Sequence, residues 1–254
     1  LCFSVGLLAI LISLGLGTYA FLFYRSLPNI AEINYITLKK IAQKRVHSNL
    51  ENKKSYYEWI ELGKTHRDYL YAITMSEDST FFEHEGLDFE AMLDSLAQNL
   101  KNKSYEYGAS TITQQVAKNL FLTQNKTINR KIKELFITRS LEKHLTKNQI
   151  LELYVNIAEF GPDIYGITAA AKEYFGKKPS QINAAEGAFI ALMLPSPRRL
   201  HYSLFQNKNL TPDKKRKIRR ILGDMLANDF ISYEQYKTYS KYDYHRRLRQ
   251  PASR

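Results

Sequence analysis

Four short segments contain polar residues that the packing of a fold does not require, and the first covers residues 77–88. It reads EDSTFFEHEGLD, with paired acids, a histidine and a glycine around two adjacent phenylalanines. A carboxylate beside aromatic surface is partly desolvated, which raises its pKa and suits it to general acid or base chemistry. The segment is therefore a candidate catalytic loop. The alternative is a solvated acidic loop in front of a helix.

The second segment, residues 108–119, reads GASTITQQVAKN and lies at or just inside a predicted helix N-terminus. The free N–H groups and the positive dipole end of a helix attract phosphate and sugar hydroxyl groups. A simple N-cap explains Ser110 but not the polar residues that follow it. Those residues are Gln114, Gln115, Lys118 and Asn119.

The third segment, residues 126–134, reads KTINRKIKE. On a helix, Arg130 and Lys131 lie four and three residues before Glu134, which places a carboxylate among cations on one face. A surface salt bridge is the plain interpretation of such a pair. The functional interpretation is a cradle for a diphosphate. Its members are Lys118, Lys126, Arg130 and Lys131.

The fourth segment, residues 150–161, reads ILELYVNIAEFG and taken alone indicates a helix that packs on its apolar face. It ends at a Gly-Pro turn.

Helical periodicity covers most of the chain from about residue 70 onward, so the soluble part is predicted to be mainly α. Asp88 is placed to cap a helix with an apolar face at residues 89–100, and Ser110 precedes a second such face at residues 112–121. Capping-box pairs and a Thr-Pro-Asp sequence predict four further helix starts, at Thr146, Asn183, Thr211 and Ser232. The sequence YYEWIEL at residues 56–62 is rich in strand formers and predicts one short strand.

The first 24 residues carry no charge and are dense in Leu, Ile, Val and Phe. A helix that crosses the hydrocarbon core of a bilayer needs about 20 apolar residues, so residues 1–24 are predicted to be a membrane anchor. A cleavable signal peptide is the alternative, although its apolar region is usually shorter. The rest is expected to divide into a connector (25–55), a catalytic domain (56–240) and a basic tail (241–254). The positive-inside rule does not settle the orientation of the anchor.

The formal net charge of +12 favours an anionic partner, which by charge alone is a nucleic acid, an anionic phospholipid or a phosphorylated substrate. The basic run at residues 214–220 raises the nucleic-acid alternative. The anchor and the lack of a recognisable nucleic-acid module favour instead the solvated or phospholipid-facing side of an amphipathic helix. None of the six histidines pairs with another at ligand spacing, so no metal site is predicted.

Read in order, the four segments and a fifth, LMLPSP at residues 192–197, resemble the signature segments of the family 51 peptidoglycan glycosyltransferases. The first four patterns are E-D-x-x-F-x-x-H-x-G-x-D, G-x-S-T-x-T-Q-Q-x-x-K-N, R-K-x-x-E and I-L-E-x-Y-x-N. The resemblance covers roughly residues 56–205. The sequence YVNIAEFG at residues 154–161 is most similar to the monofunctional biosynthetic transglycosylases of Gram-negative bacteria.

The resemblance implies a role for each matching residue. Glu77 matches the catalytic base that deprotonates the 4-hydroxyl of the acceptor sugar. Glu134 matches a second glutamate that assists at the leaving group or orders the basic cluster. The cations expected to neutralise the diphosphate are Lys118, Lys126, Arg130 and Lys131. The polar substrate-site positions are Ser110, Gln114, Gln115 and Asn119.

The resemblance also implies a lysozyme-like, mainly helical fold with a smaller membrane-associated lobe between the second and third motifs. Leu120, Phe121 and Leu122 are candidates for contact with the membrane there, with core packing as the alternative. The implied reaction polymerises lipid II into β-1,4-linked glycan strands with release of undecaprenyl diphosphate. It takes place on the periplasmic face of the bacterial inner membrane and involves no nucleic acid.

No cofactor is required by this implied reaction, although a divalent cation such as Mg²⁺ assists some relatives and stays an alternative. Cell-wall synthesis proteins are possible partners, and the sequence names none. The chain is expected to be monofunctional, because the S-x-x-K match at residues 140–143 has neither a K-T-G nor an S-D-N segment to accompany it. A muramidase of the same shape is the rival activity. The anchor, the basic cluster and the Ser/Thr/Gln/Gln segment favour a diphosphate donor instead.

Overall fold

The structure is a computed structural model of the chain. It describes residues 2–51, 55–102, 110–123, 125, 127–207 and 210–244, with residues 2–9, 102 and 207 described by their backbone alone.

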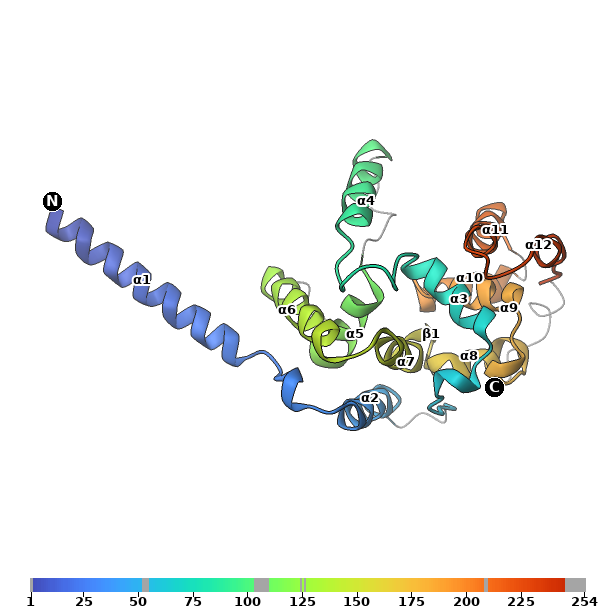
Figure 1. The fold of residues 1–254 in the computed structure, drawn as a ribbon, viewed down its shortest axis with the longest axis horizontal. Helices are drawn as coiled ribbons and strands as arrows, with labels where there is room; N and C mark the ends of the chain where they lie inside the picture. Colours follow the sequence, from blue (N-terminus) through green and yellow to red (C-terminus); the bar gives the residue numbers. More distant parts are fainter. Residues whose placement is uncertain are drawn as a thin grey trace.

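The N-terminal helix α1 (Cys2–Arg25) extends away from the body of the protein at one end (Figure 1). Its segment from Ile10 onward forms part of an apolar stretch, Ile10–Glu32, that contains an 18-residue window apolar enough to cross a membrane, and no part of that window is buried inside the protein. The base of α1 touches the body where the Phe23 ring meets the edge of Phe136, with centroids 5.7 Å apart. These features agree with the predicted single-pass anchor.

Within the predicted connector, residues 35–49 form a helix, α2 (Tyr35–Asn49), which packs on α7 (Lys147–Ile157). Leu38, Ala42 and Val46 lie on its inner face and are fully buried. This part of the predicted connector therefore belongs to the hydrophobic core. Its pattern is weak in the sequence because the buried face has one residue per turn, one of them alanine, while the exposed face also carries an isoleucine, Ile36.

The body consists of two groups of packed helices. In the group farther from α1, α3 (Arg67–Glu77) lies between α9 (Ala184–Ala191) and α11 (Pro212–Ala227). In the group nearer to α1, α5 (Ile112–Phe121) packs against α6 (Ile128–His144) and α7 (Figure 1). The remaining α-helices are α4 (Phe89–Asn102), α8 (Gly166–Phe175), α10 (Pro197–Asn207) and α12 (Tyr233–Tyr239). The fold is mainly α, as predicted.

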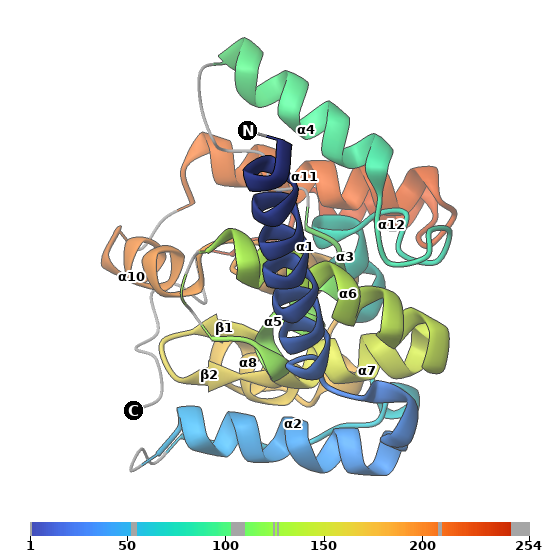
Figure 2. The same ribbon diagram turned by 90° about the vertical axis from the view of Figure 1, so that its left-hand side faces the viewer.

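Short elements connect these helices. An antiparallel pair, β1 (Glu159–Gly161) and β2 (Ile164–Tyr165), follows α7. Three 3-10 helices, η1 (Ile30–Glu32), η2 (Leu62–Lys64) and η3 (Pro179–Gln181), occur at turns. Seen from the α1 side, α2 lies along one edge of the body, and α4 with α11 lies along the opposite edge (Figure 2).

The strand predicted at residues 56–62 does not form. The described residues there are irregular and lead into η2. The main chain of Ile60 is held instead by the side chain of Asn156, whose Oδ1 accepts from Ile60 N and whose Nδ2 donates to Ile60 O, both at 2.8 Å. The residue types fit an extended chain, but a side chain takes the place of a partner strand.

Most predicted helix starts are confirmed. Thr146, Asn183 and Ser232 each form a capping box, and Asp88 accepts the Ala91 N–H at 2.8 Å at the start of α4. The N-cap of α5 is Thr111 rather than the expected Ser110.

Apart from α1, the helices α4 and α6 each carry several large apolar side chains that the core does not cover. The predicted apolar face of α4 is exposed: Phe89 66%, Leu93 67%, Leu96 55% and Leu100 70%. On α6, the exposed apolar side chains are Ile128, Ile132 and Phe136. By contrast, Leu120 and Leu122, which were candidates for membrane contact, are buried in the core at 7% and 8% exposure. The surface suited to a membrane is therefore formed by α4 and α6.

Candidate active site

Glu77 is the last residue of α3 and lies half-buried in the wall of a cleft. Its Oε2 accepts a hydrogen bond from Nε2 of Gln115 at 2.9 Å, and the hydroxyl of Tyr154 also interacts with its carboxylate. Burial raises the pKa of Glu77, whereas Gln115, Lys217 and Lys118 pull the pKa in the opposite direction. A carboxylate with a raised pKa that remains within reach of cations suits general base chemistry.

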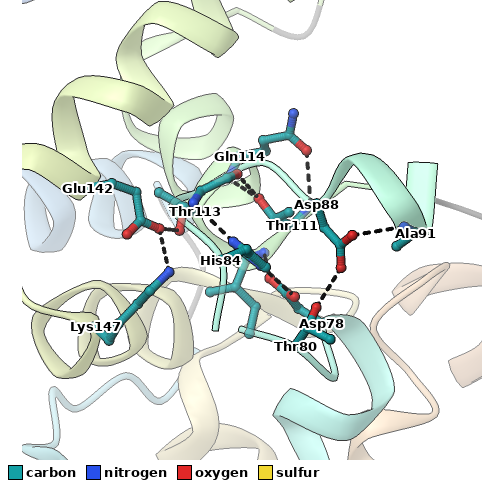
Figure 3. A network of polar contacts seen from close by, with 12 residues as sticks. Asp78, Thr80, His84, Asp88, Ala91, Thr111, Thr113, Gln114, Glu142 and Lys147 are labelled. Carbon is teal, nitrogen blue, oxygen red and sulfur yellow. Dashed lines mark hydrogen bonds and ion pairs between the residues drawn. The ribbon is translucent and has the colours of Figure 1, made fainter. Parts of the chain in front are cut away.

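The loop after Glu77 is fixed by a network centred on Asp78 (Figure 3). Asp78 Oδ1 is 2.9 Å from Nε2 of His84, and its Oδ2 accepts from the N–H of Ile112 at 2.9 Å. Asp88 accepts from the hydroxyl of Thr80 and from a main-chain N–H of α4. The network therefore joins the ends of α3, α4 and α5, and His84 and Asp88 order the loop.

A second contact, on the left in Figure 3, lies beside this loop. Glu142 of α6 accepts from the hydroxyl of Thr113 on α5 and pairs with Nζ of Lys147 on α7 at 2.9 Å. The same ammonium group lies 4.6 Å from the ring centre of Phe81. These contacts join α5, α6 and α7 to one another and to Phe81 of the catalytic loop.

The residues of the second segment divide among three places. Ser110 lines the cleft beside Glu77, and Gln115 contacts Glu77 directly. Gln114 is 1% exposed and closes the capping box with Thr111, so it supports the helix end and does not face the cleft. Asn119 lies near the other end of α5, in a small polar pocket with Arg45.

The basic cluster forms around Glu134, which is 2% exposed. Its Oε2 is 3.4 Å from a guanidinium nitrogen of Arg130, and its Oε1 pairs with Lys131. Lys118 is half-buried close to these groups, and burial lowers its pKa, with Arg130 and Lys131 acting in the same direction. The structure thus brings these predicted cradle residues together. Lys126 lies outside the described residues.

Beside Glu77, on the α11 side, lies a cleft of about 460 Å³. Its lining comes from the end of α3, the loop that follows, the start of α4 and the last turns of α11. The polar residues that line it are Ser76, Glu77, Asp78, Ser79, Asp88, Ser110, Thr111, Arg220, Asp224 and Asn228.

The contribution of α11 to the site was missed in the sequence. The run at residues 214–220 was interpreted as a solvated or phospholipid-facing side. Lys217 is instead half-buried and close enough to Glu77 to alter its pKa. Arg220 and Asp224 line the cleft one and two turns farther along the helix. The sequence did contain a signal for this, because the polar residues Lys217, Arg220 and Asp224 recur with helical spacing beside the apolar positions of the same helix.

The model of the family described as Transglycosylase matches residues 43–226. A biosynthetic peptidoglycan transglycosylase of Nitrosospira multiformis is 39% identical over 200 residues, which cover 79% of this chain and 83% of that relative. This chain belongs to the transglycosylase family. A biosynthetic peptidoglycan transglycosylase of a Janthinobacterium species is 42% identical, over 56% of this chain and 62% of the relative. Penicillin-binding protein 1A of Pseudomonas aeruginosa is 35% identical over 87% of this chain, which corresponds to 26% of that longer protein.

Membership of the family makes this transglycosylase a glycosyltransferase and confirms the predicted lysozyme-like, mainly helical fold class. The match begins at residue 43, so it includes the C-terminal end of α2. This agrees with the burial of Val46 against the rest of the domain.

Proposed function

We propose that this transglycosylase polymerises lipid II into β-1,4-linked glycan strands and releases undecaprenyl diphosphate. The observation that carries the proposal is the position of Glu77. It is a half-buried carboxylate with a basic cluster toward α6 and an open cleft rich in hydroxyl groups toward α11. A glycosyl transfer from a diphosphate needs these three features side by side.

In the proposed step, Glu77 acts as the general base. Its carboxylate takes the proton of the acceptor 4-hydroxyl while that oxygen attacks C1 of the donor sugar. The bond from C1 to the diphosphate oxygen breaks, and the diphosphate leaves with the bonding electrons. Oε2 of Glu77 accepts the hydrogen bond from Gln115, so in the proposed step the other oxygen, Oε1, takes the proton. Burial, which raises the pKa of Glu77, makes it a stronger base than an exposed glutamate.

The leaving diphosphate gains negative charge as the bond breaks. Lys118, Arg130 and Lys131 supply positive charge that is already in place, so little reorganisation is needed in the transition state. Both carboxylate oxygens of Glu134 are engaged by Arg130 and Lys131. We therefore assign Glu134 to holding these cations in position. The reaction needs no cofactor, and a divalent cation such as Mg²⁺ at the diphosphate is the alternative.

We place the enzyme on the extracytoplasmic face of a bacterial plasma membrane, held there by α1. The exposed apolar side chains of α4 and of α6 support this placement, since α6 contacts the base of α1. In this position the basic cluster on α6 lies near the surface where a lipid-linked diphosphate resides. Lipid II and the growing strand are the proposed partners.

The experiment uses detergent-solubilised protein with labelled lipid II, and products are separated by size. The proposal expects a ladder of glycan polymers that a β-1,4-specific muramidase degrades, with none from Glu77→Gln. A folded protein that makes no polymer and instead cleaves preformed glycan would support the muramidase alternative and overturn the proposal.

A further inference from the structure

Arg45 is a half-buried cation on α2 that the predicted site did not include. It directly precedes the buried Val46, on a helix that packs against both α7 and α5 (Figure 1). Within the described part of the chain no carboxylate forms an ion pair with Arg45. Glu159 lines the same small pocket, but it pairs with Arg198 at 2.8 Å. The partners of the Arg45 guanidinium group are therefore of another kind.

Arg45 binds the C-terminal end of α5 through two main-chain carbonyl groups. Its Nε donates to the carbonyl oxygen of Asn119 at 3.3 Å, and its Nη2 donates to that of Leu122 at 3.1 Å. The last carbonyl groups of a helix have no donor within the helix and form the negative end of its dipole. A guanidinium group presents its N–H groups as a rigid fork, so one arginine can hold two such carbonyls at once.

The turn that Arg45 holds carries Lys118. The carbonyl of Lys118 accepts from the main-chain N–H of Leu122 at 3.2 Å. Arg45 thus binds both the residue that follows Lys118 and the residue to which Lys118 is hydrogen-bonded. Since Lys118 belongs to the basic cluster around Glu134, the main chain of one member of that cluster is fixed from α2.

The support of Arg45 is itself firmly packed. Leu38, Ala42 and Val46 of α2 are fully buried, and α2 packs along α7. At the start of α2, the hydroxyl of Tyr35 donates to a carboxylate oxygen of Glu152 on α7 at 2.8 Å. Because α2 is fastened to α7 in this way, its contact with α5 fixes the end of α5 relative to the rest of the domain.

We propose that Arg45 is a positioning residue of the transglycosylase site, which fixes the last turn of α5 and so holds the ammonium group of Lys118 in place for a diphosphate. The inference rests on the proposed function, because a lipid-linked diphosphate is the ligand that Lys118 is proposed to meet. The side chain of lysine is long and flexible, so the place of its main chain limits where its charge can lie. Arg45 itself touches no substrate in this scheme.

The test measures the dissociation constant of a short prenyl diphosphate, geranyl diphosphate, for the full chain in detergent. Arg45→Met removes both the hydrogen bonds and the charge, whereas Arg45→Lys keeps the charge and loses the fork. Lys44→Met, a change of the exposed neighbouring cation on α2, is the matched control. Arg45→Met is also combined with Lys118→Met. Thermal unfolding shows that each variant is folded.

We expect Arg45→Met to weaken binding roughly tenfold in the parent, and by less than about twofold in the Lys118→Met background, because residues that act through one another are not additive. Arg45→Lys should lie between the parent and Arg45→Met, since an ammonium group lacks the planar fork that binds two carbonyls. Lys44→Met should leave the dissociation constant at the parent value.

Hydrogen exchange provides a second readout that does not depend on binding. The main-chain N–H of Leu122, which closes the last turn of α5, should exchange faster in Arg45→Met than in the parent. The amides of α7 should keep their protection, because the change opens the end of α5 and not the whole domain.

The inference is overturned if Arg45→Met leaves the affinity unchanged, or if it weakens binding equally with and without Lys118. Equal weakening would indicate a long-range effect of the lost charge. Unchanged exchange at Leu122 would overturn it as well. If the folded parent does not bind the diphosphate, the proposed function fails instead, and the exchange at Leu122 still shows whether Arg45 holds the turn.

Discussion

Glu77 is placed between groups that act on its pKa in opposite directions. Burial makes the charged form less favourable, and the nearby charge of Asp78 adds to that effect. The hydrogen bond from Gln115 and the charges of Lys217 and Lys118 make the charged form more favourable. A general base must be ionised at working pH and still accept a proton, so this balance matters for the rate.

Removing the charge of Lys217 tests this balance. Lys217→Gln should raise the pKa of Glu77 further, because an opposite charge that favours the carboxylate is lost. Since the base works when deprotonated, the acid limb of the kcat/KM profile should move to higher pH. Arg216→Gln, a change of an exposed cation on the same helix, is the control and should leave the limb in place. An unmoved limb in Lys217→Gln would refute the electrostatic coupling.

Gly86 is a second single residue with a strong constraint. Its φ of +88° is a conformation that other residues rarely adopt. A Cβ there would lie 2.7 Å from Cγ of Glu142 and 2.9 Å from a methyl group of Thr138. Its carbonyl also accepts from the hydroxyl of Thr111 at 2.7 Å. The catalytic loop therefore depends on glycine at this position.

Gly86→Ala should lower the free energy of unfolding by roughly 1–3 kcal/mol through backbone strain and crowding. It should also reduce activity, since the loop carries the network around Asp78. Chemical unfolding measures the first effect. Gly63→Ala serves as the matched change, because a Cβ at Gly63 meets nothing within 4 Å. Equal stability of the two variants would show that the loop tolerates the strain.

Among the secondary-structure elements, α4 differs most from what a soluble domain requires. Its exposed leucines and phenylalanine lie on one face, and single-sided apolar patches of this kind mark contact surfaces. The helix lies at one edge of the body, in the view from the α1 side (Figure 2). We expect a lipid surface as its partner, because α1 is long and apolar enough to anchor the protein in a membrane.

A fluorophore attached at Leu96 tests this contact in full-length protein reconstituted into liposomes. In a Cys2→Ser background, a polarity-sensitive dye on Leu96→Cys should emit at shorter wavelength and be quenched by spin-labelled lipids. The matched position is Tyr233 on α12, which is also exposed but lies at the far end from α1 (Figure 1). Equal, water-like emission from both positions would contradict the membrane contact of α4.

The same elements show what could be predicted from the sequence. Caps at Thr146, Asn183 and Ser232 are local patterns, and they were predicted correctly. The periodicity of α4 gave its apolar face but not the fact that the core leaves that face uncovered. The prediction of a strand at residues 56–62 was wrong, because the main chain there is hydrogen-bonded to the side chain of Asn156, a residue distant in the sequence, and not to a second strand.

In the site, too, local patterns were predicted and contacts between distant segments were not. Glu77, Gln115 and the cluster around Glu134 were predicted because their segments match a family pattern, and the structure brings these groups together in two neighbouring places. Lys217 and Asp224 were missed, since their role depends on how α11 crosses α3. A single sequence shows the helical face but not what it meets in the fold.

For the whole molecule, the order of parts along its long axis fits the proposed reaction. The anchor is at one end, α6 with its cations follows, and α3 with Glu77 lies beyond it toward α11 (Figure 1). A substrate tied to the membrane by its diphosphate can therefore reach the cations while its sugars extend toward Glu77. The helices α9, α11 and α12 lie at the end opposite the anchor (Figure 1).

The most direct test of the central claim is the rate of a single turnover for Glu77→Gln. The donor is a lipid-linked tetrasaccharide whose terminal 4-hydroxyl is blocked, and the acceptor is a lipid-linked disaccharide with a phosphonate link that cannot leave. Both are present at saturating concentration. The account predicts that this rate falls by roughly 10²–10⁴-fold, because the proton acceptor is lost while binding is kept. Glu83→Gln, an exposed acid of the same loop, should react at the parent rate. Comparable rates for the parent and Glu77→Gln would contradict the assignment of Glu77 as the base.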